Sequence, residues 1–116
     1  MSGRETQLQR MLLAAVPYKL PWLRLYRRMV GQAEVRGAQV RFGVKGQCDL
    51  YGFTRGGRHV EIELKSVSGR MSPEQCAWRD SLVGWNVAWF CLSARVGETD
   101  EEVVARWLAE LSALKE

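Results

Sequence analysis

Several features that would assign this chain to a familiar class of protein are missing. No apolar run approaches the roughly 20 residues that a membrane-spanning helix needs, and the first 16 residues lack the layout of a signal peptide. There is one histidine, and the three cysteines show no Cys-x-x-Cys spacing, which argues against a structural zinc site. We therefore expect a soluble cytoplasmic protein that does not bind membranes and has reduced, mostly buried thiols.

Acidic residues are scarce in the first part of the chain. Residues 1–70 contain 13 Lys/Arg and five Asp/Glu, whereas residues 71–116 contain four and eight. A basic segment favours a polyanionic partner such as nucleic acid, although solvated surface charge gives the same pattern. Two of the five acids are Asp49 and Glu63, and acids isolated among basic residues suggest a site that binds a cation and an anion together.

The length of 116 residues fits one domain, 1–116. Capping signals and hydrophobic periodicity predict a mixed α/β fold, with a mixed sheet flanked by helices. The predicted elements are, in order, a helix from Ser2 stopped by Pro17 and Pro21, a strand over 22–30, a short strand or extended loop over 36–43, strands over 48–53 and 59–65, a helix from the Ser72 cap to Gly84, a strand over 87–92, and a helix from the Thr99 cap.

The apolar positions predict where the core lies. The last helix carries a buried stripe formed by Val104, Trp107, Leu108, Leu111 and Leu114. Four of the five tryptophans are expected in the core: Trp78, Trp85, Trp89 and Trp107. Trp22 is expected in the core or a dimer contact, with stacking on DNA as the alternative.

The segments 48–53 and 59–65 form a predicted hairpin that gathers charged side chains. Side chains alternate along a strand, so Glu61, Glu63 and Lys65 share one face while the apolar residues between them face the core. A two-residue turn would put Asp49 on the opposite face. A three-residue Arg55–Gly57 loop pairs Asp49 with Glu63, and its third position suits glycine. We predict that register, although a bulge elsewhere would also restore it.

Two adjacent carboxylates repel each other unless a cation lies between them. A hard divalent ion with oxygen ligands, Mg²⁺ or Mn²⁺, is the natural occupant. Charged residues on the outer face of a half-exposed strand would produce the pattern Glu-x-Lys without any site. The addition of Asp49 at the predicted register favours the metal site.

The sequence resembles the VRR-NUC family of the PD-(D/E)xK nuclease superfamily. The resemblance rests on the pattern Gly46-x-x-Asp49-Leu50, then Glu63-x-Lys65, then Gly69-x-x-Ser72-Pro73-x-Gln75 with Trp78 following. It covers about residues 43–92, and we expect it to extend over the whole chain. It implies a restriction-endonuclease-like core of order α-β-β-β-α-β, here followed by an extra C-terminal helix.

By position, the resemblance implies that Asp49, Glu63 and the backbone carbonyl of Leu64 bind the metal. Lys65 would orient or activate the attacking water, and Gln75 would sit beside the active site. Gln75 also fits a capping box with Ser72, so its spacing has a purely structural explanation.

Glu5 matches an acid that relatives carry on their first helix, where it acts on the metal through water. A capping box with Ser2 explains the same spacing, and we leave both alternatives open. His59 is expected to be solvated or hydrogen-bonded rather than catalytic. The basic residues proposed to contact phosphates are Lys45, Arg70, Arg55, Arg58 and Arg41.

The resemblance implies a Mg²⁺- or Mn²⁺-dependent endonuclease of phage or bacterial type, found in a bacterial or phage-infected cell. Stand-alone proteins of this size resemble homodimeric enzymes that cut branched DNA such as Holliday junctions. A two-fold dimer would place two sites on symmetric strands. The alternatives are a flap or nicking nuclease in phage DNA replication or repair, and a nucleic-acid-binding module that does not cleave.

Overall fold

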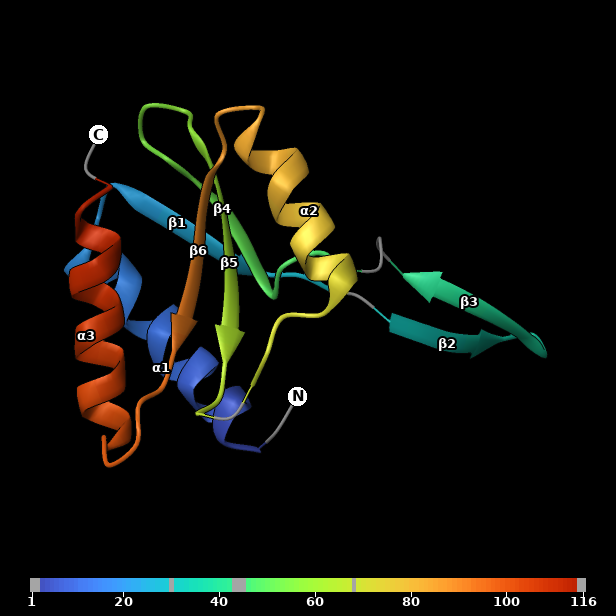
Figure 1. Cartoon of the computed structure of the whole chain (residues 1–116), viewed down its shortest axis with the longest axis horizontal. Helices are drawn as coiled ribbons and strands as arrows, with labels where there is room; N and C mark the ends of the chain where they lie inside the picture. Colours follow the sequence, from blue (N-terminus) through green and yellow to red (C-terminus); the bar gives the residue numbers. More distant parts are fainter. Residues whose placement is uncertain (1–2, 30, 43–45, 68, 115–116) are drawn as a thin grey trace.

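The computed structural model describes residues 3–29, 31–42, 46–67 and 69–114, except that the side chains of 31–33 and 40–42 lie outside that description. It confirms the mixed α/β class (Figure 1). The elements are α1 (Gly3–Lys19), β1 (Leu23–Arg27), β2 (Gly31–Val35), β3 (Ala38–Phe42), β4 (Leu50–Thr54), β5 (His59–Lys65), α2 (Pro73–Val83), β6 (Ala88–Ser93) and α3 (Asp100–Ser112).

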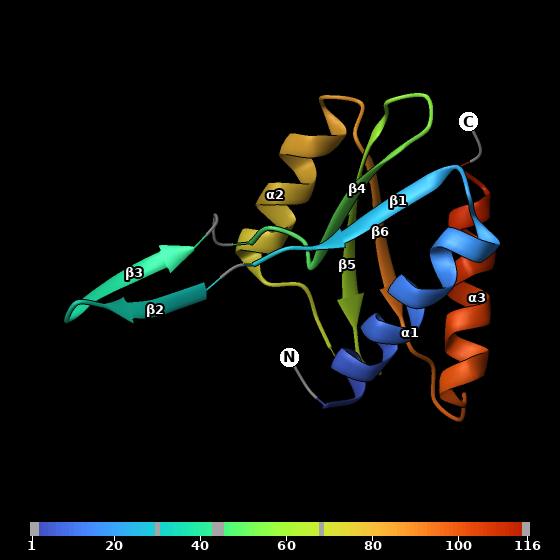
Figure 2. The same cartoon turned by 180° about the vertical axis from the view of Figure 1, so that it is seen from behind.

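The central sheet has four strands in the order β1-β4-β5-β6. The first three run antiparallel and β6 is parallel to β5, so the sheet is mixed, as predicted. Helices α1 and α3 lie on one side of the sheet, and α2 lies on the other (Figures 1 and 2). The core between the sheet and α1 and α3 includes Leu8, Leu12, Leu23, Leu50, Val60, Ile62, Leu64, Val103 and Trp107.

Helix α1 continues past the proline that was predicted to stop it. Pro17 lies inside the last turn, where it removes one N–H donor. The amide of Leu20 still donates to the carbonyl of Val16 at 2.8 Å. Pro21 disfavours helical geometry at the residue before it, so the helix ends at Lys19, close to that second proline.

Residues 31–42 form a separate two-stranded hairpin, β2–β3, of which only the second strand was anticipated from the sequence. The segment Arg36 to Gly43 was expected to be a short strand or an extended loop, and β3 occupies most of it. Strand β2 was not predicted at all. It pairs antiparallel with β3 across a two-residue Arg36–Gly37 turn. The hairpin projects away from the four-stranded sheet (Figure 1).

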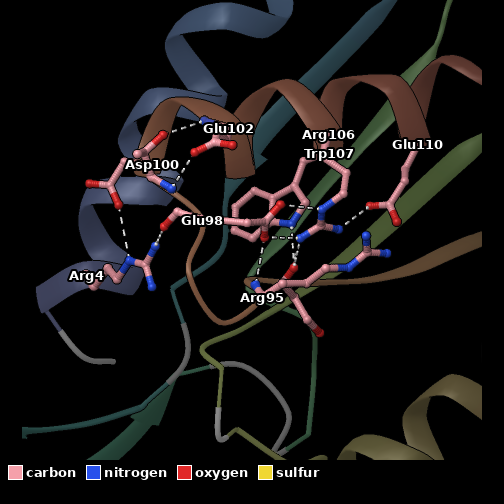
Figure 3. Close-up of polar contacts among 10 residues, drawn as sticks. Arg4, Arg95, Glu98, Asp100, Glu102, Arg106, Trp107 and Glu110 are labelled. Carbon is pink, nitrogen blue, oxygen red and sulfur yellow. Dashed lines mark hydrogen bonds and ion pairs between the residues drawn. The ribbon is translucent and has the colours of Figure 1, made fainter.

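A polar network ties α3 and α1 to the end of β6 (Figure 3). The carbonyl of Ser93, the last residue of β6, accepts hydrogen bonds from Trp107 Nε1 at 3.1 Å and from Arg106. Glu98 forms an ion pair with Arg106 at 2.8 Å. Arg4 of α1 donates to the carbonyl of Glu98 at 2.9 Å. The predicted Thr99 cap at the start of α3 is also present, and it forms a capping box with Glu102.

Two burial predictions were wrong. Trp85 was expected in the core, but it is 83 % exposed because it follows the end of α2 in a turn. The thiols were expected to be mostly buried; Cys48 is buried, whereas Cys91 lies exposed on β6. Burial raises the pKa of the Cys48 thiol to about 12. Among the described residues, no helix has the length and apolar character required to span a bilayer.

Candidate active site

The β4–β5 connection is the predicted three-residue loop, Arg55–Gly57. The amide of Thr54 donates to the carbonyl of Arg58 at 3.0 Å, which closes the strands around three residues. Gly57 has a φ of 89°, a conformation that side chains with a Cβ rarely adopt. The predicted loop length and the role of its third residue are therefore confirmed.

This loop brings the two carboxylates of the predicted site together. Leu50 pairs with Ile62, and the register continues to Asp49 opposite Glu63. Asp49 lies just before β4 and accepts a hydrogen bond on Oδ2 from the backbone N–H of Leu64 at 2.9 Å. The Asp49 side chain thus accepts the N–H of Leu64, which a main-chain carbonyl would accept if the β4–β5 ladder continued.

Gln75 links the start of α2 to the charged face of β5. Its Oε1 accepts from Lys65 Nζ at 2.9 Å and from the Ser72 amide at 2.9 Å. Its Nε2 donates to Glu63 Oε1 at 2.9 Å. The capping box with Ser72 is also complete. The two explanations of Gln75 are therefore compatible, because one carboxamide has enough donors and acceptors for both.

Helix α2 covers the face on which Glu63 was predicted to lie, and Glu63 is only 3 % exposed. Its Oε1 lies 3.6 Å from Lys65 Nζ. Its Oε2 has no hydrogen-bond partner among the described residues. Burial, the charge of Asp49 and a bond to Asp49 that forms only with a proton raise the pKa of Glu63 to about 8.

These residues fit a hard divalent cation. Oε2 of Glu63 is a buried acceptor without a donor among the described residues, and the neighbour of this carboxyl group, Asp49, is another carboxylate. The N–H of Leu64 points to Asp49, and the carbonyl of an extended residue points to the same strand edge as its N–H. Among the described residues, no three or more His, Cys, Asp or Glu side chains form a metal-binding group. Mg²⁺ needs only one or two carboxylates, because it keeps several waters.

Glu5 lies at the end of β5. Its Oε1 accepts from the backbone N–H of Ser66 at 3.0 Å, one residue beyond Lys65. It does not join the two carboxylates of the site in a group of three. Ser2, the other residue of the competing capping box, lies outside the described residues.

The predicted phosphate contacts are spread over the molecule. Arg55 and Arg70 are exposed, at the β4–β5 loop and before α2 respectively. Arg58 donates to a backbone carbonyl beyond α2 at 3.3 Å, away from the two carboxylates. Lys45 and the side chain of Arg41 lie outside what the structure describes.

A second buried carboxylate, Glu61, forms a network that was not predicted. Arg28 binds both of its oxygens, His59 Nε2 contacts Oε2, and Trp78 Nε1 donates to Oε1 at 3.3 Å. Burial opposes the charge of Glu61, but the bonds from Arg28 and His59 outweigh it and lower the pKa. The sequence pattern that could have predicted part of this network is the alternation along β5 of His59, Glu61, Glu63 and Lys65, which places them on one face. The expectation that His59 is hydrogen-bonded is confirmed.

Gly46, the first residue of the motif, has a structural reason to be glycine. Its φ is 94°, and a Cβ built there would lie 2.4 Å from the carbonyl oxygen of Glu74. The chain leading to Asp49 therefore passes against the first turn of α2. This close approach holds Asp49 and Gln75 on neighbouring segments.

No protein-family model matches this sequence, and the curated proteins searched contain no match to it. The resemblance to the VRR-NUC family therefore rests on the motif residues and their spacing.

Proposed function

We propose that this chain is a Mg²⁺- or Mn²⁺-dependent endonuclease that hydrolyses phosphodiester bonds in DNA. One observation carries the proposal. The buried Oε2 of Glu63 has no donor, and the carboxyl group to which it belongs lies beside the carboxylate of Asp49 and pairs with Lys65. A structural ion pair needs only one carboxylate for one lysine. Without an ion, the raised pKa of Glu63 favours a proton on the second carboxylate, and a divalent cation bound between the two groups would displace that proton.

The roles of the chain's own residues follow from their contacts. Asp49 and Glu63 would hold the ion together with the Leu64 carbonyl. A bound Mg²⁺ or Mn²⁺ supplies positive charge to a phosphate oxygen and lowers the pKa of bound water. Lys65 holds a compact positive charge beside the carboxylates, where it stabilises charge that develops at phosphorus. Gln75 fixes Lys65 and Glu63 relative to each other.

The topology supports assignment to the restriction-endonuclease-like core. Helix α1 precedes the antiparallel strands β1, β4 and β5, and α2 then leads to β6, which is parallel to β5. This is the order α-β-β-β-α-β, with the β2–β3 hairpin inserted and α3 added at the end. Branched DNA as the preferred substrate and a homodimer as the active form are part of the proposal.

Cleavage assays test the proposal. Wild-type protein with Mn²⁺ should cut labelled junction, flap and linear duplex DNA, with the junction cut fastest. Lys65→Ala should reduce cutting by about 10²-fold or more, because a charge at the transition state is lost. It should leave DNA binding in EDTA intact. Lys19→Ala, at the end of α1, is the matched control and should cut normally.

Metal binding gives a second readout that does not depend on cleavage. Mn²⁺ should raise the melting temperature of the wild type, because it binds only the folded chain. Glu63→Gln and Asp49→Asn should abolish that rise, whereas Asp80→Asn on the exposed side of α2 should not. The proposal fails if the wild type cuts none of the three DNAs with Mn²⁺, or if Lys65→Ala cuts as fast as the wild type.

A further inference from the structure

Three aromatic side chains form a continuous strip across β1 and β4. The rings of Tyr26 and Tyr51 have centroids 5.9 Å apart, and those of Tyr26 and Phe53 are 6.1 Å apart. Tyr26 is 45 % exposed and Phe53 is 47 % exposed. Single exposed aromatics are ordinary on a protein surface, whereas here two rings flank Tyr26 and the three together present one apolar surface.

The strip lies on the same face of the sheet as the candidate active site. Tyr26 pairs with Tyr51, and Tyr51 pairs with Glu61, which alternates with Glu63 on β5. Helix α2 packs on β6 and reaches Glu61 through Trp78. Helices α1 and α3 cover the opposite face (Figure 2). The half of the face made by β1 and β4 therefore stays open beside α2.

Cationic side chains lie beside the strip. Arg24 shares the face of Tyr26 on β1, and neither β1 nor β4 contains an acidic residue. The acid next to the strip, Glu61 of β5, is paired with Arg28. The guanidinium of Arg28 lies 4.7 Å from the centre of the Tyr51 ring, and its bonds to Glu61 hold it there. At the far end, Arg24, Phe53 and Arg55 help to line an open cavity of about 180 Å³.

The strip leads directly to the two carboxylates. Tyr51 and Phe53 follow Asp49 at intervals of two residues, so their side chains are about 7 Å and about 14 Å further along the same face. Aromatic rings beside a basic groove are the usual means by which proteins hold unpaired bases, because every base has a π-face on which to stack.

We propose that Tyr26, Tyr51 and Phe53 form a stacking platform for unpaired nucleotides, which directs a single-stranded segment of the DNA substrate to Asp49 and Glu63. This inference rests on the proposed nuclease function and narrows its substrate to DNA with unpaired bases, such as an open branch point or a flap. A fully paired duplex keeps its bases stacked inside the helix and cannot use the rings.

Binding measurements with the full chain in EDTA test the platform without cleavage. The probes are a fluorescent oligothymidylate and a blunt hairpin duplex. The double variant Tyr26→Leu/Phe53→Leu should weaken oligothymidylate binding by about tenfold or more and change duplex binding by less than about twofold, because phosphate contacts remain. Tyr18→Leu and Trp85→Leu remove rings that are 87 % and 83 % exposed elsewhere and should change neither.

Cross-linking uses the wild-type chain, so its result does not depend on whether the variants fold. An oligothymidylate carrying 5-iodouracil should cross-link under ultraviolet light to peptides that contain Tyr26, Tyr51 or Phe53. The platform is refuted if the cross-links map elsewhere. It is also refuted if the double variant binds both probes as tightly as the wild type does, or binds both more weakly by the same factor.

If the platform is refuted but the wild type still cuts DNA with Mn²⁺, the nuclease proposal is retained. Cross-links on the strip without any Mn²⁺-dependent cutting would refute the nuclease and keep the platform as a binding site.

Discussion

At the scale of single residues, the molecule contains carboxylates in opposite electrostatic settings. Glu63 is buried beside Asp49, and its pKa is raised to about 8. Glu61, two residues earlier on the same strand face, is equally buried, but Arg28 and His59 lower its pKa. The difference is that each oxygen of Glu61 has donors, whereas one oxygen of Glu63 has none. The oxygen that lacks a donor, Oε2 of Glu63, is therefore the one available to a ligand.

Glu98 provides a residue-scale prediction about pH. Hydrogen bonds from Arg106 lower the pKa of Glu98 to about 2, from an ordinary value of 4.5. A lowered pKa stabilises the folded chain above pH 4.5, and that stabilisation is lost as the pH falls towards 2. Glu98→Gln should therefore unfold more easily than the wild type at neutral pH, and the difference should disappear in acid.

Chemical denaturation at a series of pH values measures this effect. Glu110→Gln is the matched control, because Glu110 also faces Arg106, at 3.5 Å, but is more exposed. It should change stability less than Glu98→Gln at every pH. A Glu98→Gln difference that is independent of pH would contradict the assignment.

At the scale of elements, the start of α2 serves the helix and the site at once. The same carboxamide of Gln75 completes the capping box and bonds Lys65 and Glu63. The position of the helix is thus coupled to the position of the charged groups on β5. Helix α3 has an equivalent capping box, formed by Thr99 and Glu102, far from the site.

The two boxes allow the roles of Gln75 to be separated. Glu102→Ala should lower the free energy of unfolding by about 1 kcal/mol, because it removes one capping bond. Gln75→Ala should lower it by at least as much, because it also removes the bonds to Lys65 and Glu63. Only Gln75→Ala should also lower the rate of DNA cutting, by about 10- to 100-fold, as expected for loss of a residue that orients others. If both variants cut DNA at the same rate, Gln75 acts only as a helix cap and has no role in the site.

At the scale of the whole molecule, the β2–β3 hairpin stands apart from the body. Its two strands pair chiefly with each other, and it belongs to neither face of the four-stranded sheet. A two-stranded sheet contributes little stability alone. The core that supports the site is formed without it, from α1, α3 and the central sheet.

Replacement of residues 31–42 by a short Gly/Ser linker should therefore preserve the fold. Circular dichroism should show a cooperative thermal transition within about 5 °C of the wild type, which corresponds to about 1 kcal/mol for a domain of this size. Replacement of residues 55–57 by the same linker is the control, and it should destabilise the chain because it disturbs the β4–β5 register. Loss of the cooperative transition on removal of the hairpin would show that the hairpin supports the body.

The sequence by itself determined the local features of this protein. The loop length and the glycine at its third position determined the register of β4 on β5, which places Asp49 opposite Glu63, because register depends on residues close in the chain. The capping boxes of α2 and α3 were likewise local. The end of the first helix was predicted too early, because a proline in the last turn does not stop a helix. Strand β2 was not predicted, because a short isolated hairpin gives a weak sequence pattern.

Only the tertiary structure decided what is buried and what is open. The packing of α2 made Glu63 a buried acceptor and brought Gln75 to it. The pairing of β1 with β4, distant in sequence, brought Arg28 to Glu61 and Tyr26 to Tyr51. Tryptophan is a residue type typical of the core, yet the side chain of Trp85 is 83 % exposed. Burial depends on contacts between segments far apart in the chain, and a local pattern cannot specify which segment packs against which.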